Sequence, residues 1–489
     1  MSSVPSNMKS ATHTMKNYSK MPIRIIPNNQ GALRAGDTAV FQFPQAKILQ
    51  RSSFRLQFKA STNGIAGEMI GFPKYIASLI SQIEIYCNGV SVQNITNYNQ
   101  IYKIMRDFSS DYDVYERKNF NNSDPSVDYA MTDAGAITKY NTYTTTGVEA
   151  VNQFKRDYVI DDFIGFFDKE NLTEGNDFFN TNLVGSLEIH ITFAPNSVLW
   201  RGNGATAPTY TITDLYGWVD AIEFKDDTYI RALESKLSSG SHIIPFKNYR
   251  WYQGADTVAT KETTIRITEN TQCLDKLLFT YLDSTRTTTN TLQLGNQAQI
   301  AGNSADAGAL LIAQNHINED GWIPQKCFNY DYLKSVKHPN LLNTSIFFRR
   351  NGVGLGYNAG RTATTLIQYE IDSQDLHNPM SIASVYEETL KAFGLNQNNL
   401  HKCNPAISNV DLYLKDFFVS AYSLSHLYNK PDGYLLTGVD TMSTSMNIAV
   451  KVSNQALAGH ANQTSTPVLI TEFTSLLEIG NGRAVKITQ

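Results

Sequence analysis

The chain has few cysteines, and none of them is placed for a metal site or a disulfide framework. Its four cysteines, Cys87, Cys273, Cys327 and Cys403, are scattered along the sequence. No Cys-x-x-Cys pair and no cysteine–histidine cluster occurs, although structural zinc sites use such spacings. We therefore expect no metal and no cofactor, and this cysteine usage suits assembly in a reducing compartment.

Long apolar runs and a surplus of one charge are also missing. No apolar run approaches the roughly 18 residues that suggest a membrane-spanning helix. Residues 1–20 are polar and contain no apolar signal core, so we do not expect export through a signal peptide. The net charge of −4 gives no electrostatic reason for the chain to grip nucleic acid or an anionic membrane.

Catalytic signatures are absent as well. A glycine-rich segment lacks the full spacing of a phosphate-binding loop, and a Ser/His segment lacks the strand–turn–helix context of a hydrolase nucleophile. Two aspartate pairs lie in polar stretches, so we interpret them as solvated loop charges and not as paired catalytic or metal-binding carboxylates. One histidine lies on the polar face of a predicted strand, where a surface or inter-subunit role is favoured. These residues are Gly352–Gly356, Ser238–His242, Asp111 with Asp113, Asp161 with Asp162, and His190.

The residues that are abundant favour sheet. The chain has 489 residues, 11% of them aromatic, with 26 Tyr and 24 Phe. The patterned segments are rich in Tyr, Phe, Thr, Val and Ile, while Asn, Thr, Ser and Gly crowd the stretches between them. A chain of this length can build two cores of about 200–250 residues each. The composition therefore predicts an all-β protein with two domains.

The most informative stretch is a strand, a turn and a helix at residues 75–107. Apolar and polar residues alternate over Ile80–Cys87, and Asn88-Gly89 then supplies a tight hairpin turn. Helical spacing follows from Tyr98 to Arg106. A similar order recurs in the second half as a strand over 365–371, a polar turn and a helix over 384–393. In that helix Ser384 and Glu387 have the spacing of a capping box.

The strand candidates divide into two sets of about eight, separated near residue 238. We expect a flexible arm over 1–20, a first domain over 21–237 and a second domain over 238–489. Polar, poorly patterned segments at 108–160 and 287–306 are predicted to be long decorating loops. A helix is expected over 226–237. Eight antiparallel strands in two facing sheets form a jelly roll, so the sequence predicts two in tandem, with short inserted helices.

Several segments, taken in order, resemble one family of viral proteins. They are Ala77–Gly89 with Tyr98–Tyr102, Asn182–Ile191 with Ala194-Pro195 and Val198-Leu199, Tyr210–Asp220 with Ile222, and Gly240–Tyr249. Together they are similar to the double jelly-roll major capsid proteins of polinton-like viruses and virophages. The last hundred residues match this pattern less clearly.

The resemblance implies a structural subunit and no enzyme. It implies a homotrimer that forms pseudo-hexameric capsomers and tiles an icosahedral shell around a double-stranded DNA genome. The implied partners are neighbouring capsomers, penton proteins and minor capsid proteins, with no sequence-specific nucleic-acid binding and no assignment of an internal membrane. The implied location is the virion capsid, assembled inside the host cell, where the arm could bridge neighbours.

Two readings from other classes compete with a shell subunit. A β-sandwich glycan-binding spike or adhesin is the main alternative, since aromatic, Asn-rich loops could stack on sugars. A β-sandwich hydrolase is less favoured, because no nucleophile or carboxylate constellation occurs.

Overall fold

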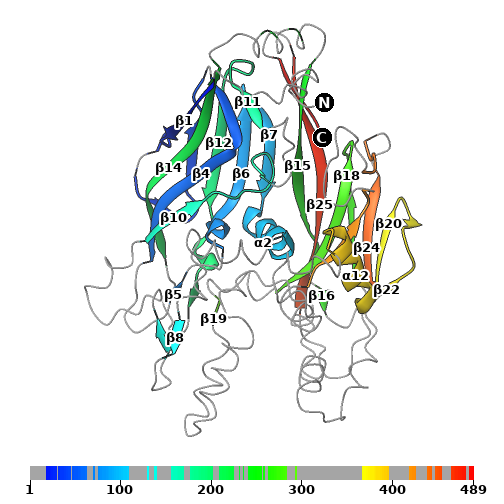
Figure 1. Ribbon diagram of the computed structural model, residues 1–489. Coiled ribbons are helices and arrows are strands. Elements are labelled where there is room, and N and C mark those ends of the chain that lie inside the picture. Colours follow the sequence, from blue (N-terminus) through cyan, green and yellow to red (C-terminus); the bar gives the residue numbers. More distant parts are fainter. Residues whose placement is uncertain are drawn as a thin grey trace.

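The two halves of the chain are built from sheets with the same strand order. The computed structural model describes residues 18–109, 156–224, 241–293, 366–395, 418–425, 438–453 and 464–489 apart from short gaps, with residues 129–131, 137–139, 231 and 235. Most of these residues are in antiparallel strands. In Figure 1 the long strands of both halves run in nearly the same direction, and the two halves lie side by side.

The first half contains two sheets. One has the order β1 (Tyr18–Ile25), β14 (Tyr210–Phe224), β4 (Ile48–Thr62) and β10 (Arg156–Ile160), with β2 (Leu33–Arg34) against β14 and β11 (Phe178–Asn180) against β4. The other has the order β3 (Thr38–Gln42), β12 (Leu187–Phe193), β6 (Ile80–Cys87) and β7 (Val90–Thr96).

The second half repeats the order of the four main strands in each sheet. One sheet has the order β15 (His242–Gln253), β25 (Thr464–Ile479), β18 (Leu274–Asp283) and β23 (Ser420–Ser423), with β16 (Thr257–Val258) and β26 (Val485–Thr488) against β25. The other has the order β17 (Thr263–Thr268), β24 (Asn447–Ser453), β20 (Leu366–Ile371) and β21 (Gln374–Asp375), with β22 (Met380–Ser381) against β20. In each half the first strand therefore pairs with the last long strand, which is the duplication that the sequence predicts.

Two smaller sheets complete the strand inventory of the described residues. The strand β13 (Trp200–Arg201) pairs antiparallel with β5 (Ile70–Gly71) and parallel with β19 (Leu292–Gln293), so it joins segments of both halves. The strands β8 (Tyr129–Met131) and β9 (Ile137–Lys139) form a separate pair.

Alternating side chains build the cores. In β12 every second residue from Leu187 to Phe193 is buried, and the residues between them are only partly covered. In β6 the inward residues Ile83, Ile85 and Cys87 are buried as the alternation predicts. The buried apolar residues of the two halves form one continuous cluster.

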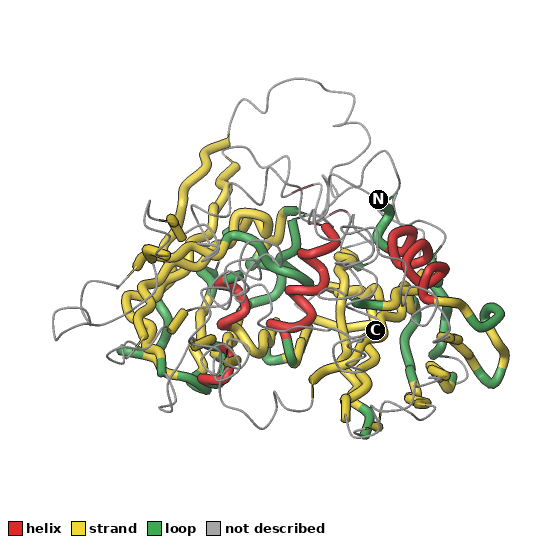
Figure 2. Tube along the Cα trace, turned by 90° about the horizontal axis from the view of Figure 1, so that it is seen from below, coloured by secondary structure: helices red, strands yellow, loops and turns green. Residues whose placement is uncertain are grey.

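The predicted strand–turn–helix module is present in both halves. Asn88 and Gly89 have φ angles of 50° and 78°, and Asp372 and Ser373 have φ angles of 51° and 64°, so each forms a two-residue turn with left-handed backbone. The helices that follow are α2 (Tyr98–Ser109) and α12 (Ile382–Ala392). In Figures 1 and 2, α2 lies near the middle of the molecule and α12 toward the right.

Some expected boundaries were wrong. The cap of α12 is Ser381, whose side chain accepts a hydrogen bond from the Ser384 amide, so the capping position lies three residues before Ser384. The segment 108–160 is not loop throughout, because it contains β8, β9 and β10. The strand β1 begins at Tyr18, within the expected arm. The rest of the arm, the expected strand at 345–349 and most of 226–237 and 287–306 lie outside the described residues.

Candidate functional site

The structure separates the residues considered for chemistry. Asp161 lies 3.3 Å from Lys169, and both side chains are more than a third exposed, as expected for loop charges. Asp162 corrects the interpretation of its pair as solvated, because its side chain is only 13% exposed and lies 2.5 Å from the Arg106 guanidinium. The sequence around Asp162 does not show that the buried Arg106 covers its carboxylate. Gly352–Gly356, Asp111, Asp113 and Ser238–Gly240 lie outside the described residues.

His190 lies on the polar face of β12, where the alternation places it. Its ring packs against the Tyr86 ring at 4.8 Å between centroids, and its Nε2 lies 3.5 Å from the Glu188 carboxylate. His242 is the buried first residue of β15. Neither histidine belongs to a metal-binding group of side chains within the described part of the chain.

Two cysteine thiols lie in the described core. Burial raises the pKa of Cys87 to about 12 and the pKa of Cys273 to about 11, so both thiols are neutral at physiological pH. A neutral buried thiol is neither a good nucleophile nor a metal ligand. Among the helices described, none is long and apolar enough to cross a membrane.

The most developed polar and aromatic site in the described structure is the contact between the two halves. We call it the inter-half contact and define it by Gln93, Phe166, Phe246, Phe108 and Phe393. Strand β7 of the first half lies against β15 of the second half, which brings the first three residues together. The other two residues lie at the ends of α2 and α12.

Gln93 links the halves through its side-chain amide. Its Nε2 donates to the carbonyl of Lys247 at 3.0 Å and lies 3.3 Å from Oδ1 of Asn248, both on β15. Its Oε1 accepts a hydrogen bond from the Phe166 amide at 2.9 Å. Gly165 makes this approach possible, because it has a φ of +90° and a Cβ there would lie 2.4 Å from Oε1 of Gln93.

Phe166 continues the contact with its ring. It packs edge-to-face on Phe246 of the second half at 5.4 Å and on Phe179 of the first half at 5.7 Å. The Arg51 guanidinium lies over the same ring at 4.7 Å and donates to the Phe166 carbonyl at 3.2 Å. Burial lowers the pKa of Arg51 to about 10, against the opposing effect of Asp177.

A buried charge network holds the Phe166 loop on α2. Arg106 pairs with Asp162 and donates to the carbonyl of Phe163 at 3.1 Å, and it lies 3.7 Å from Asp168. One turn earlier Tyr102 donates to Asp162 at 3.1 Å. Because the charges are buried, each depends on its partner to offset lost hydration. The network therefore fixes the position of the loop that carries Phe166.

A second network of charged side chains joins β15 to its sheet neighbours β18 and β25. Lys247 Nζ lies 2.8 Å from Asp275 and 3.9 Å from Glu472, and it donates to Thr474 at 3.0 Å. Burial lowers the pKa of Lys247, but the attraction of Asp275 and Glu472 outweighs it and the net pKa is raised. Lys247 is therefore a cation, and it lies on the strand whose backbone accepts the hydrogen bond from Gln93.

The inter-half contact binds the two halves together through hydrogen bonds and aromatic packing. The sequence offered weak signals for it. Residues 163–167 form a short, mostly apolar run, and the helices at 98–106 and 384–393 are predicted. No pattern in the sequence pairs Gln93 with Asn248 or Phe108 with Phe393, because these contacts join distant segments.

Comparisons with known proteins agree with this architecture at the level of fold. No family model and no curated protein matches the sequence. The solved PBCV-1 virus capsid matches with a TM-score of 0.54 at 12% identity, over 97% of each chain. The Sputnik virophage structure matches with a TM-score of 0.53 at 10% identity, over 97% of this chain and 88% of that chain. The chain therefore has the double jelly-roll fold of viral capsid proteins, as the sequence resemblance implies.

Proposed function

We propose that this chain is a major capsid protein, a structural subunit that forms trimers and tiles a shell around a double-stranded DNA genome. The observation that carries the proposal is the repeated sheet order, β1-β14-β4-β10 in one half and β15-β25-β18-β23 in the other. The inter-half contact joins these two similar blocks side by side. The likeness to the PBCV-1 and Sputnik capsid structures supports the same role.

The six-sided outline of such a tile follows from the number of jelly rolls in a trimer. Two similar blocks in each chain become six in a trimer, so three-fold symmetry approximates six-fold symmetry and the pseudo-hexameric outline fills an icosahedral lattice. A cyclic trimer needs only one repeated type of interface to close. The proposed blocks are two jelly rolls that divide near residue 238, and the first of them starts with β1 at Tyr18. The proposed partners are copies of this chain, neighbouring capsomers, and penton and minor capsid proteins, all in the virion.

Solution mass and electron microscopy of the expressed full chain test the proposal. We expect a mass three times that of the chain, and class averages with three-fold symmetry and six lobes. A monomer that is retained on a glycan array would contradict the shell role and support the spike or adhesin. A monomer with neither property would also overturn the shell role.

The N-terminal segment is proposed to bridge neighbouring capsomers after assembly. Because β1 begins at Tyr18 and pairs along β14, the test removes only residues 1–17 and leaves the strand intact. We expect the shortened chain to form trimers but to assemble shells poorly. If the chain without residues 1–17 assembles shells as well as the full chain in light scattering and electron microscopy, the bridging role is wrong.

A further inference from the structure

The elements that form the inter-half contact have counterparts elsewhere in the chain that do not meet each other (Figure 1). Within the chain, the hairpin β6–β7 of the first half lies against β15, the first strand of the second half. The repeated sheet orders make β20–β21 the equivalent of β6–β7, and β1 the equivalent of β15. In Figure 1, β1 and β20 lie at opposite sides of the molecule, so these two equivalents do not meet within one chain.

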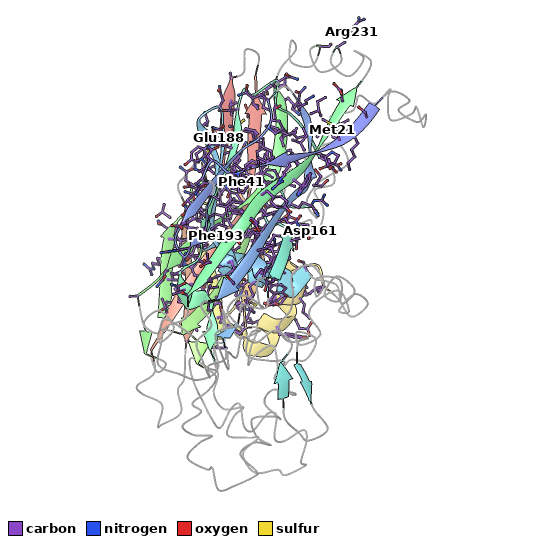
Figure 3. All side chains as sticks on the ribbon, turned by 90° about the vertical axis from the view of Figure 1, so that its left-hand side faces the viewer. Met21, Phe41, Asp161, Glu188, Phe193 and Arg231 are labelled. Atoms are coloured by element: carbon purple, nitrogen blue, oxygen red, sulfur yellow. The ribbon has the colours of Figure 1, made fainter. Side chains whose placement is uncertain are left out.

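The sheet face beside β1 has the composition of an interaction surface. The Arg24 guanidinium lies 4.1 Å from the centroid of the Tyr216 ring, and that of Arg55 lies 5.8 Å from the centroid of Trp218. The two rings contact each other edge-to-face at 6.0 Å. We call these four residues the arginine–aromatic face, and Figure 3 looks onto β1 and β14, which carry part of it. Arginine, tyrosine and tryptophan are the residues most enriched at binding hot spots.

Charge and exposure mark this face as available. Arg24 and Arg55 are exposed, and among the described residues neither forms an ion pair. Stacking on an aromatic ring leaves the edge of a guanidinium free for a carboxylate. Just beyond β1, the side chain of Ile26 is 50% exposed. The two arginines and the two aromatic rings offer cationic and apolar surface side by side.

The opposite side of the molecule carries matching charge. The turn and strand after β20 present Asp372 and Asp375, both exposed and without an ion pair among the described residues. Asp372 uses one carboxylate oxygen to accept a hydrogen bond from the Asn447 amide at 2.8 Å. Glu370 on the same hairpin is already paired with Lys451, so it does not compete for the arginines.

We infer that the arginine–aromatic face of one copy binds the β20–β21 hairpin of a second copy. The contact is head-to-tail: Arg24 and Arg55 face Asp372 and Asp375 of the neighbouring copy. A head-to-tail contact closes into a ring when its rotation divides a full turn, and the proposed trimer requires a contact of this closing kind. The inference rests on the proposed function, since it names the surfaces that form the trimer.

Charge reversal with rescue tests the inference on the full chain. The double variant R24E/R55E and the double variant D372K/D375K are each expected to raise the concentration at which trimers dissociate by at least about tenfold, because like charges then meet across the interface. Combining all four substitutions restores opposite charges, so trimers are expected to return. Mass photometry over a dilution series measures all three.

Controls separate this inference from the proposed function. R266E reverses an exposed arginine on β17, at the far edge of the sheet that contains β20, and is expected to leave the trimer unchanged. Far-UV circular dichroism checks that each variant is folded. If the unaltered chain is monomeric, the proposed function fails. If it is trimeric and R24E/R55E dissociates at the same concentration, or if the fourfold variant is not rescued, this pairing of surfaces is wrong while the trimer stands.

Discussion

Phe108 at the end of α2 and Phe393 at the end of α12 stack nearly parallel, with ring centroids 4.4 Å apart and planes 11° from parallel. The two helices follow equivalent hairpins in the two halves, so the repeated module touches its own copy at this point. The Lys276 ammonium lies 5.5 Å from the Phe393 centroid, which adds a cation–π contact. The stack therefore joins the halves where their helices end.

A double-mutant cycle on this stack measures how strongly the halves are coupled. Phe108→Leu and Phe393→Leu should each lower the free energy of unfolding, and the pair should deviate from additivity by about 0.5–1.5 kcal/mol. Chemical denaturation followed by fluorescence checks this. Phe58→Leu is the control partner for Phe393→Leu, because Phe58 packs on Tyr158 within the first half. Additive losses at Phe108 and Phe393 would contradict the coupling.

Gly165 should tolerate alanine far less well than Gly89. Both have positive φ, so alanine is expected to cost about 1–2 kcal/mol at either position from backbone conformation alone. At Gly165 the added Cβ also meets Gln93, whose amide is held by Phe166 and Lys247, and overpacking of this kind costs about 1–3 kcal/mol more. Around Gly89 nothing lies within 4 Å. Equal losses in melting temperature for the two variants would show that Gln93 moves away freely.

Removing Arg106 from α2 should lower the free energy of unfolding much more than removing the exposed Lys169 from the neighbouring loop. Arg106→Met removes the guanidinium that faces the buried carboxylates of Asp162 and Asp168, and such a change costs about 3–5 kcal/mol. Lys169→Met breaks the exposed pair with Asp161 and should cost less than about 1 kcal/mol. Urea denaturation of both variants gives the comparison. A small loss for Arg106→Met would mean that water enters the network.

The chain should lose stability in alkaline solution through its buried thiols. Burial raises the pKa of Cys87 to about 12 from an ordinary value of 9.0, and that of Cys273 to about 11. Above pH 9 the two thiols of the native chain keep protons that the same thiols of the unfolded chain have released. The free energy of unfolding therefore falls as pH rises above about 9. Substituting both residues with alanine should flatten this slope between pH 9 and 11. An unchanged slope would assign the loss to other groups.

Local patterns predicted much of the fold. Period-two alternation located β6 at Ile80–Cys87, because one face of the strand is buried against a core. The pair Asn88-Gly89 predicted the hairpin turn at this position, since glycine takes positive φ easily. The turn at Asp372-Ser373 was predicted only as a longer polar segment, because neither residue is a glycine. Short strands such as β10 and β26 were missed, since a few residues carry too little periodicity.

The contacts between distant segments could not be predicted in this way. Asp162 looked like a loop charge because its burial depends on Arg106, which belongs to a helix in another part of the sequence. The sequence around the predicted hairpin turn does not show that Gln93 is buried, because it lies where β7 packs on β15 and binds the Lys247 carbonyl.

The sequence by itself determined the all-β class, the two sets of strands and the repeated strand–turn–helix module. These features depend on local alternation, turn chemistry and helical spacing, which are written in neighbouring residues. Only the tertiary structure decided that the two halves share one strand order and that Gln93, Phe166 and Phe108 fasten them together. It also placed Arg24 and Arg55 on a face opposite the hairpin with Asp372 and Asp375. Such relationships arise from packing between segments far apart in the chain, where no local pattern records the partner.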